Sequence, residues 1–283
     1  MHISTLQAKH PIGVFDSGIG GLTVAQGIAH ALPNEQIVYF GDTAHMPYGE
    51  KSAEAIQGYS VKICQFLLQH QCKIIVIACN TASSVAVELL QEQMAGRVTV
   101  INVIDPVVEA VKQSGIGRVG VLATQRTTKT GVYPHKISLA SPGVKVMAKA
   151  AASLASIIEE GMFHSAHTMK AIMDYYLSDP CLEQIEGLIL GCTHYPIIKN
   201  HINNYYNGKV QIFDATETVA QAVKEQLRNQ QLLCPDTRKA QHHFYVSDYT
   251  HSFEQATKIF FGTQVHLNHY PIWEMIEQIT PLK

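Results

Sequence analysis

Short apolar runs rich in β-branched residues recur along the chain, and segments with a helical pattern separate them. The runs form a first and a second series, at 12–15, 36–40, 73–78 and 98–103 and then at 118–124, 144–150, 186–192 and 209–213. Apolar strands that alternate with helices are typical of parallel sheets covered on both faces. The pattern therefore predicts an α/β fold of two similar lobes, each with a mainly parallel sheet flanked by helices.

The length and the order of the elements also suggest how the chain divides. Its 283 residues exceed a usual single domain of about 100 to 200 residues. A helical pattern and a strand-like run at 242–248 follow the second series, and we assign this tail to the first lobe. We expect the first lobe to comprise 1–105 and 215–283, and the second lobe to comprise 106–214.

Composition narrows the classes of partner. Hydrophobic residues make up 46% and charged residues 16% of the chain, which favours a globular protein over a disordered one. The net charge is -2 and no run of Lys or Arg occurs, so neither nucleic acid nor an anionic membrane is an expected partner. Small molecules are favoured instead.

The cysteines and the apolar segments indicate a cytoplasmic protein. The six cysteines form no CxxC pair and no dense framework, which suits a reducing compartment better than a disulfide scaffold. The start of the chain lacks the pattern of a secretory signal peptide, and no apolar run approaches the roughly 18 residues of a membrane span. Each cysteine is therefore judged singly.

Two cysteines occur in matching contexts, at the expected ends of buried strands. Cys79 lies in IVIACNTAS of the first series, and Cys192 lies in LILGCTHYP of the second. Ligands of doubly wound sheets bind beyond the carboxyl ends of the strands. The matching positions predict one cleft between the lobes, lined by both cysteines. A buried cysteine with no chemical role is the alternative for either one alone.

Two cysteines on opposite sides of a substrate could exchange a proton at an α-carbon. An enzyme that interconverts mirror images must remove a proton from one face and return one to the other. A thiolate can act as the base, and the opposing thiol as the acid. Polar residues after Cys79 and Cys192 place both at expected strand-to-helix turns, where a thiolate is favoured.

Other polar residues could complete such a site. Asp16 and Ser17 precede a glycine-rich turn that could bring backbone N–H groups to an anionic ligand, although Asp16 could equally cap a helix. Tyr48 and Gly49 lie in a polar loop that could cover the site or form a simple turn. His194 could share one face with Cys192, or be a hydrogen-bonded structural residue.

Three competing sites have weaker support. The GIGG turn lacks the full dinucleotide fingerprint and no P-loop lysine follows it. A zinc site built on His164 and His167, or on His242 and His243, has no visible set of further ligands. A papain-like Cys/His nucleophile would leave the second cysteine segment unexplained.

Taken together, the motifs resemble those of the glutamate racemase family. They span about residues 11–216, in the order PIGVFDSGIGGLTV, FGDTAHMPYGEKS, IVIACNTASSVA, GVLATQRTTKTGVY, IIEEG and LILGCTHYP. The resemblance implies two α/β lobes, no pyridoxal phosphate or other cofactor, no metal, and conversion of L-glutamate to D-glutamate for peptidoglycan synthesis.

The resemblance also implies roles for single residues. Cys79 would be the base for the D-enantiomer and Cys192 the base for the L-enantiomer, with Asp16 and His194 assisting them. Glu159 matches an acidic position of the family, although the flanking AAASLASII departs from the family pattern. The substrate-binding segments would contribute Asp16, Ser17, Tyr48, Gly49, Asn80, Thr81, Thr124, Thr127, Thr193 and His194.

Alternatives remain at this stage. Two-base chemistry does not define side-chain length, so a racemase for aspartate or another acidic amino acid is the nearest alternative to a glutamate racemase. A noncatalytic regulatory or protein-binding member of the same fold is the alternative of a different class, and the presence of both cysteine contexts disfavours it. The resemblance leaves open activation by a peptidoglycan precursor and assembly as a homodimer.

Overall fold

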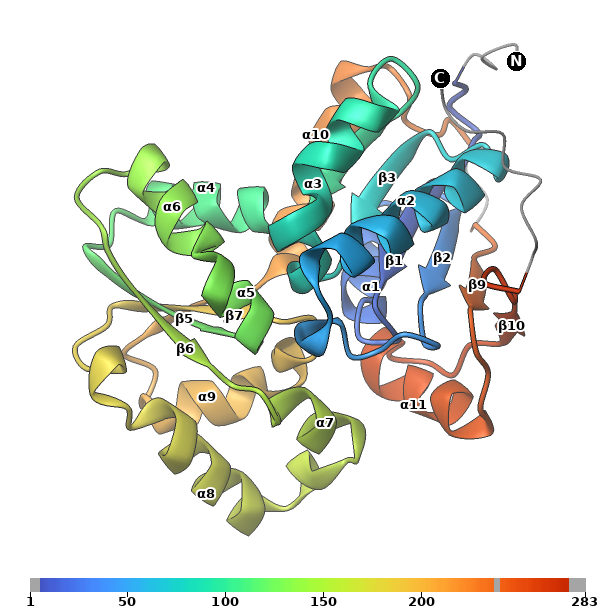
Figure 1. Ribbon diagram of the computed structural model, residues 1–283. Helices are drawn as coiled ribbons and strands as arrows, with labels where there is room; N and C mark the ends of the chain where they lie inside the picture. Colours follow the sequence, from blue (N-terminus) through green and yellow to red (C-terminus); the bar gives the residue numbers. More distant parts are fainter. Residues whose placement is uncertain (1–5, 237–239, 275–283) are drawn as a thin grey trace.

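Two parallel sheets organise the molecule, one in each lobe (Figure 1). The computed structural model describes residues 6–236 and 240–274. The larger sheet has the strand order β10-β9-β2-β1-β3-β4, and the smaller sheet has the order β6-β5-β7-β8. All neighbouring strands pair in parallel. These observations confirm the expected fold class.

The larger sheet consists of β1 (Ile12–Asp16), β2 (Ile37–Gly41), β3 (Ile74–Ile77), β4 (Thr99–Asn102), β9 (His243–Val246) and β10 (Leu267–His269). Every residue of β1, β2 and β3 is buried, as expected for central strands with helices on both faces. The tail of the chain thus adds two strands to the larger sheet: β9 pairs with β2, and β10 pairs with β9.

The smaller sheet repeats the central part of the larger one. It consists of β5 (Arg118–Ala123), β6 (Lys145–Ala150), β7 (Gly187–Gly191) and β8 (Gln211–Phe213). The order β6-β5-β7-β8 corresponds to β2-β1-β3-β4, so β5 takes the place of β1 and β7 takes the place of β3. The strands that precede the two matched cysteines are therefore equivalent in the two lobes.

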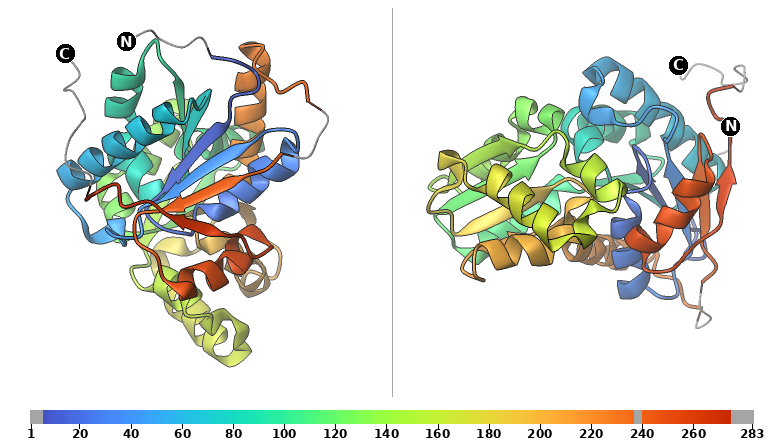
Figure 2. Two further views of the ribbon diagram at one scale, coloured as in Figure 1. Left: turned by 90° about the vertical axis from the view of Figure 1, so that its right-hand side faces the viewer. Right: turned by 90° about the horizontal axis from the view of Figure 1, so that it is seen from below.

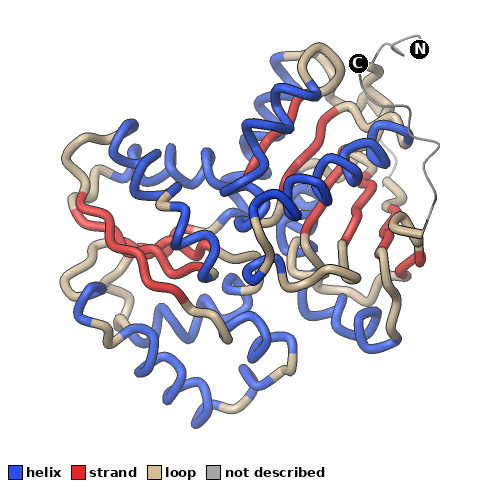
Figure 3. Tube along the Cα trace, viewed as in Figure 1, coloured by secondary structure: helices blue, strands red, loops and turns tan. Residues whose placement is uncertain are grey.

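Helices flank both sheets (Figure 3). The larger sheet is accompanied by α1 (Leu22–Ala31), η1 (Tyr48–Glu50), α2 (Ala53–Gln69), α3 (Asn80–Met94), α10 (Ala215–Asn229) and α11 (His251–Phe261). The helix α4 (Ile104–Ser114) leads into the second lobe and packs against α10 and α6. The smaller sheet is accompanied by α5 (Gln125–Thr130), α6 (Val132–Ala140), α7 (Leu154–Glu159), η2 (Met162–His164), α8 (Ala166–Leu177), η3 (Pro180–Leu182), η4 (Tyr195–Ile198) and α9 (Lys199–Tyr205).

The two lobes lie side by side when the molecule is seen from below (Figure 2). Both halves of the tail belong with the first lobe, since α10 packs on α1 and β9 pairs with β2. This packing supports a division of the chain near 105 and 215, although the boundaries themselves stay a prediction.

The sequence pattern missed β10. This strand is three residues long, lies at the edge of the sheet and contains Asn268 and His269 between apolar neighbours. Its short length leaves no alternation to detect, and its pairing with β9 is what defines it.

A buried ion pair fastens the end of the larger sheet that lies opposite the interlobe region. The Lys73 ammonium, directly before β3, contacts the Glu35 carboxylate and also donates to the carbonyls of Ala8 and Leu232. The other Glu35 oxygen accepts from the Cys234 N–H at 2.8 Å. Both charged side chains are almost fully buried. The pair therefore joins the chain before β1, the loop before β2 and the segment after α10.

Removing one partner of this pair should destabilise the fold strongly. Lys73→Met would leave the Glu35 carboxylate buried without a counter-charge, and we expect the free energy of unfolding to fall by about 3 to 5 kcal/mol. Urea unfolding followed by circular dichroism measures it. Lys112→Met, which breaks an exposed ion pair with Glu109, is the matched control and should change the midpoint of urea unfolding little. Equal effects of the two substitutions would contradict the structural role of Lys73.

Candidate active site

The carboxyl ends of the central strands of both sheets meet at one enclosed cavity. Asp16 ends β1, Cys79 follows β3, Thr124 follows β5 and Cys192 follows β7. The cavity has a volume of about 60 Å³. It is lined by Ser17, Gly18, Met46, Pro47, Tyr48, Gly49, Cys79, Asn80, Thr81, Thr124, Ala155, Ser156, Glu159, Cys192, Thr193 and His194.

Cys79 caps the first turn of α3. Its sulfur accepts a hydrogen bond from the Ala82 N–H at 3.4 Å and lies 3.6 Å from the Ser17 hydroxyl. Burial raises the pKa of the Cys79 thiol to about 12, and the negative charge of Asp16 acts in the same direction. Without a substrate, Cys79 is therefore a neutral thiol at physiological pH, ready to donate a proton.

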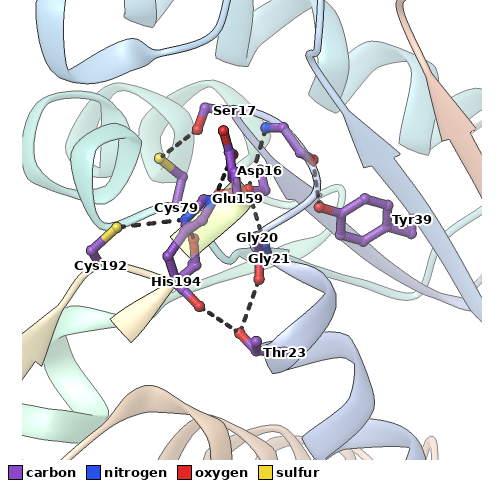
Figure 4. Close-up of polar contacts among 12 residues, drawn as sticks. Asp16, Ser17, Gly20, Gly21, Thr23, Tyr39, Cys79, Glu159, Cys192 and His194 are labelled. Carbon is purple, nitrogen blue, oxygen red and sulfur yellow. Dashed lines mark hydrogen bonds and ion pairs between the residues drawn. The ribbon is translucent and has the colours of Figure 1, made fainter. Parts of the chain in front are cut away.

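Cys192 has a different environment, because an imidazole faces its sulfur. The Cys192 sulfur lies 3.7 Å from Nδ1 of His194, and Nε2 of His194 lies 2.7 Å from the Glu159 carboxylate (Figure 4). Burial alone would lower the pKa of His194, but hydrogen bonds with Cys192 and Glu159 outweigh it and raise the pKa to about 10. The resulting imidazolium stabilises negative charge on the facing sulfur.

Asp16 is buried between the glycine-rich turn and the two sulfur-bearing segments. One carboxylate oxygen accepts from the N–H groups of Gly21 at 2.9 Å and Gly18 at 3.2 Å. The other oxygen is buried and has no hydrogen-bond partner among the described residues. Burial raises the pKa of Asp16, while the positive charge of His194 opposes this shift. The free oxygen makes Asp16 a candidate to bind a positive or proton-donating group.

Hydrogen bonds between the lobes hold the cavity walls together. The Thr81 hydroxyl bonds to that of Thr124 at 3.0 Å, and Thr124 bonds to Thr127 at the same distance. The Tyr133 hydroxyl of α6 donates to the Asn80 side-chain oxygen at 2.7 Å. Hydroxyl and amide groups from both lobes therefore define one polar wall.

The glycine turn approaches the second lobe closely. Any Cβ at Gly20 would collide with the His194 ring and the Thr193 side chain. The Thr23 hydroxyl, one turn later, donates to the Thr193 carbonyl at 3.0 Å. A side chain at Gly20 would thus displace the imidazole that faces Cys192.

The segment 46–49 forms the remaining wall. Tyr48 is 1% exposed, and its hydroxyl donates to the Asp42 carboxylate at 2.6 Å. Gly49 lies against the Thr124 side chain of the other lobe, at ordinary contact distance from where its own Cβ would be. The loop therefore crosses the opening between the lobes.

The structure brings the residues expected from the sequence into one cluster. Most of them line the cavity, whereas Asp16 and Thr127 lie behind its wall and reach it through their hydrogen bonds. Sequence reasoning did not select Gly18, Met46, Pro47, Ala155 or Ser156 as site residues. The last two precede Glu159 by one helical turn of α7, so their spacing could have indicated a shared face.

The described part of the chain has neither a metal-binding cluster nor a membrane-spanning helix. It contains no group of three or more His, Cys, Asp or Glu side chains arranged to hold a metal ion, and His164 and His167 belong to no such group. None of its helices is both long and apolar enough to span a bilayer.

A larger groove lies elsewhere, between α4 and α10. It has a volume of about 710 Å³ and is lined partly by the carboxylates of Asp105, Glu109, Glu217 and Glu225. Its described lining includes no cysteine or histidine. The small cavity holds the groups suited to proton transfer, so we identify it, and not the larger groove, as the candidate active site.

Comparisons with known proteins agree with this geometry. A family model described as Asp/Glu/Hydantoin racemase matches residues 12–223. The glutamate racemase of Chlorobaculum tepidum is 39% identical over 92% of this chain and 95% of its own length. The structure of Francisella tularensis glutamate racemase in complex with D-glutamate has 37% identity and a TM-score of 0.87, covering 94% of this chain and 98% of that one.

A second solved structure extends the comparison. Escherichia coli glutamate racemase, in complex with L-glutamate and the activator UDP-MurNAc-ala, has 25% identity and a TM-score of 0.70. The likeness covers 89% of this chain and 95% of the Escherichia coli chain. The chain therefore belongs to the Asp/Glu/Hydantoin racemase family and is an isomerase of the amino-acid racemase type.

Proposed function

We propose that this protein is a cofactor-independent glutamate racemase that works by two-base proton transfer between Cys79 and Cys192. The observation that carries the proposal is the placement of two buried thiols, from equivalent strand ends of different lobes, in the lining of one cavity. Figure 4 displays both sulfur atoms on the same side of the His194 and Glu159 pair. The similarity to glutamate racemases over most of the chain supports glutamate as the substrate.

The unlike surroundings of the two thiols support different roles for them in the resting enzyme. Cys192 faces the His194 imidazolium and is the base that removes the α-proton of L-glutamate. Cys79, held as a neutral thiol by burial and by Asp16, is the acid that protonates the opposite face. The roles reverse for D-glutamate. Hydrogen bonds with Cys192 and then with Glu159 raise the pKa of His194, so Glu159 assists through His194 without contacting the α-carbon.

The remaining residues bind the substrate and shield it from water. Ser17, Asn80, Thr81, Thr124 and Thr193 present hydroxyl or amide groups at the cavity. Such donors can hold the carboxylates of an amino acid and the negative charge that develops after deprotonation. Tyr48 and Gly49 close the wall, and Thr127 orients Thr124 and Thr81. Asp16 orients the turn and offers its free oxygen beside the reaction site.

The cellular role follows from the reaction. D-glutamate supplied by such an enzyme serves peptidoglycan synthesis, and a cytoplasmic location keeps both thiols reduced. Activation by a peptidoglycan precursor is a second proposal, motivated by the activator in the Escherichia coli structure. Assembly as a homodimer stays a prediction. An aspartate racemase is the alternative activity, and the identity to glutamate racemases disfavours it.

Isotope exchange tests the two-base mechanism directly. Purified protein without pyridoxal phosphate or metal should convert L-glutamate in heavy water to D-glutamate, measured by polarimetry and proton NMR. Because different groups remove and return the proton, early product should carry deuterium while the remaining L-glutamate keeps its proton. Deuterium appearing equally in both at early times would contradict two separate bases, and turnover of aspartate alone would transfer the proposal to that substrate.

Single substitutions test each thiol. Cys79→Ser and Cys192→Ser should each lower the racemisation rate at least about 100-fold, because general acid–base groups contribute factors of this size or more. Cys234→Ser, at a partly exposed cysteine outside the cavity lining, is the matched control and should retain activity. Normal turnover in either active-site variant would remove that cysteine from the mechanism.

The pH dependence should report the charge of His194. The imidazolium is present below the pKa of about 10 and is lost as the pH rises through it, so L-to-D turnover should decline above pH 10. Glu159→Gln removes a charge that raises this pKa, and the decline should therefore begin at lower pH. Initial rates between pH 7 and 11 provide the measurement. An unchanged pH profile in Glu159→Gln would show that the ion pair between His194 and Glu159 does not control the decline of the rate at high pH.

A further inference from the structure

A buried carboxylate behind the cavity wall collects hydrogen bonds from distant parts of the chain. Asp42, directly after β2, is fully buried, and its N–H donates to the Asp16 carbonyl at 3.0 Å. Its carboxylate accepts from the Tyr48 hydroxyl at 2.6 Å, the Ser247 hydroxyl at 2.8 Å and Nε1 of Trp273 at 2.8 Å. A buried charge satisfied in this way fixes the position of each donor.

Trp273 is also fixed by its ring contacts. Its ring lies edge-on to His45, with centroids 4.6 Å apart, and to Tyr59 at 5.3 Å. His45 stacks on Tyr59 at 4.0 Å and bonds to Asp42 at 3.0 Å, while the Lys62 ammonium lies 5.2 Å from the Trp273 ring centroid. The end of the described chain is therefore anchored on the loop that precedes Tyr48.

The same network reaches the cavity through Tyr48. Its ring lines the cavity and packs near Tyr59, with centroids 5.7 Å apart. Burial raises the pKa of Tyr48 well above its usual value, and the charge of Asp42 acts in the same direction, so the hydroxyl remains a donor. Because Asp42 takes this hydrogen bond, Tyr48 serves the site as a fixed wall and not as a proton donor to a substrate.

We propose that Asp42 and Trp273 are positioning residues for the racemase, which together hold Tyr48 and the segment 46–49 against the substrate. This inference rests on the proposed function, because it assigns the residues to the same cavity. Neither residue lines the cavity, and both act on it through Tyr48. The C-terminal segment around Trp273, on which the sequence motifs gave no information, thereby becomes part of substrate binding.

Kinetic constants of two variants test the positioning role. Trp273→Phe keeps an aromatic ring and removes the N–H donor, and Asp42→Asn removes the charge that holds Tyr48. Both should raise KM for glutamate about five- to tenfold with kcat changed less than about twofold, as expected from a lost hydrogen bond to a buried charge outside the reacting groups. Tyr270→Phe is the matched control, since its ring packs on Phe66 and its hydroxyl has no hydrogen bond to any residue that the structure describes. It should leave both constants unchanged.

Fluorescence offers a readout that does not depend on turnover. Trp273 is the only tryptophan of the chain, so the tryptophan emission arises at this network. Saturating D-glutamate should change that emission in the unmodified protein. Tyr48→Phe removes the hydroxyl that links Trp273 to the cavity, and its response should be much smaller while calorimetry still detects binding. The comparison of the unmodified protein with Tyr48→Phe also tests the positioning role if Trp273→Phe fails to fold.

The outcomes separate the two proposals. Unchanged KM in folded Trp273→Phe and Asp42→Asn would overturn the positioning role and leave the racemase proposal intact. If calorimetry shows that the unmodified protein binds D-glutamate but the Trp273 emission does not respond to it, the positioning role is likewise overturned and the racemase proposal stands. Absence of both binding heat and racemisation in the unmodified protein would overturn the proposed function, and this inference with it.

Discussion

Hydrogen bonds that cross between the lobes determine where the two thiols stand. Each cysteine follows a strand of its own sheet, so neither sheet alone fixes the distance between them. Thr23 bonds to the Thr193 carbonyl beside Cys192, and Tyr133 bonds to Asn80 beside Cys79. These bonds join residues adjacent to the cysteines, and the geometry of the cavity depends on them.

Equivalent positions in the two sheets acquire different electrostatic surroundings. Burial and the nearby Asp16 carboxylate raise the pKa of Cys79, and hydrogen bonds with Ala82 and Ser17 oppose this rise only in part. Cys192 is next to the His194 imidazole, whose pKa is raised by hydrogen bonds with Cys192 itself and with Glu159. The repeat of strand order thus places the two cysteines at equivalent positions, and the residues around each strand end give them different neighbours.

Sequence patterns predicted every strand of both sheets except β10, because buried parallel strands are continuous apolar runs and β10 is a three-residue edge strand. They also predicted the cluster at the carboxyl ends of β1, β3, β5 and β7, since parallel strands bring these ends to one edge. The pattern could not show that Trp273 donates a hydrogen bond to Asp42, because 231 positions separate the two residues. Only the pairing of β9 with β2 and of β10 with β9 brings the tail of the chain close to Asp42. The pattern also could not predict that Cys79 is a neutral thiol, because its raised pKa results mainly from burial in the folded protein.

The equal free energies of the two enantiomers limit what the unequal surroundings of the thiols can change in the rates of the two directions. L- and D-glutamate have equal free energies in water, so the equilibrium ratio of a racemisation is one. By the Haldane relation, kcat/KM must then be the same in both directions. Any advantage that His194 gives to one direction of turnover is matched by a proportional difference in KM. The asymmetry of the site can therefore set which enantiomer is held more tightly, and it cannot set which one accumulates.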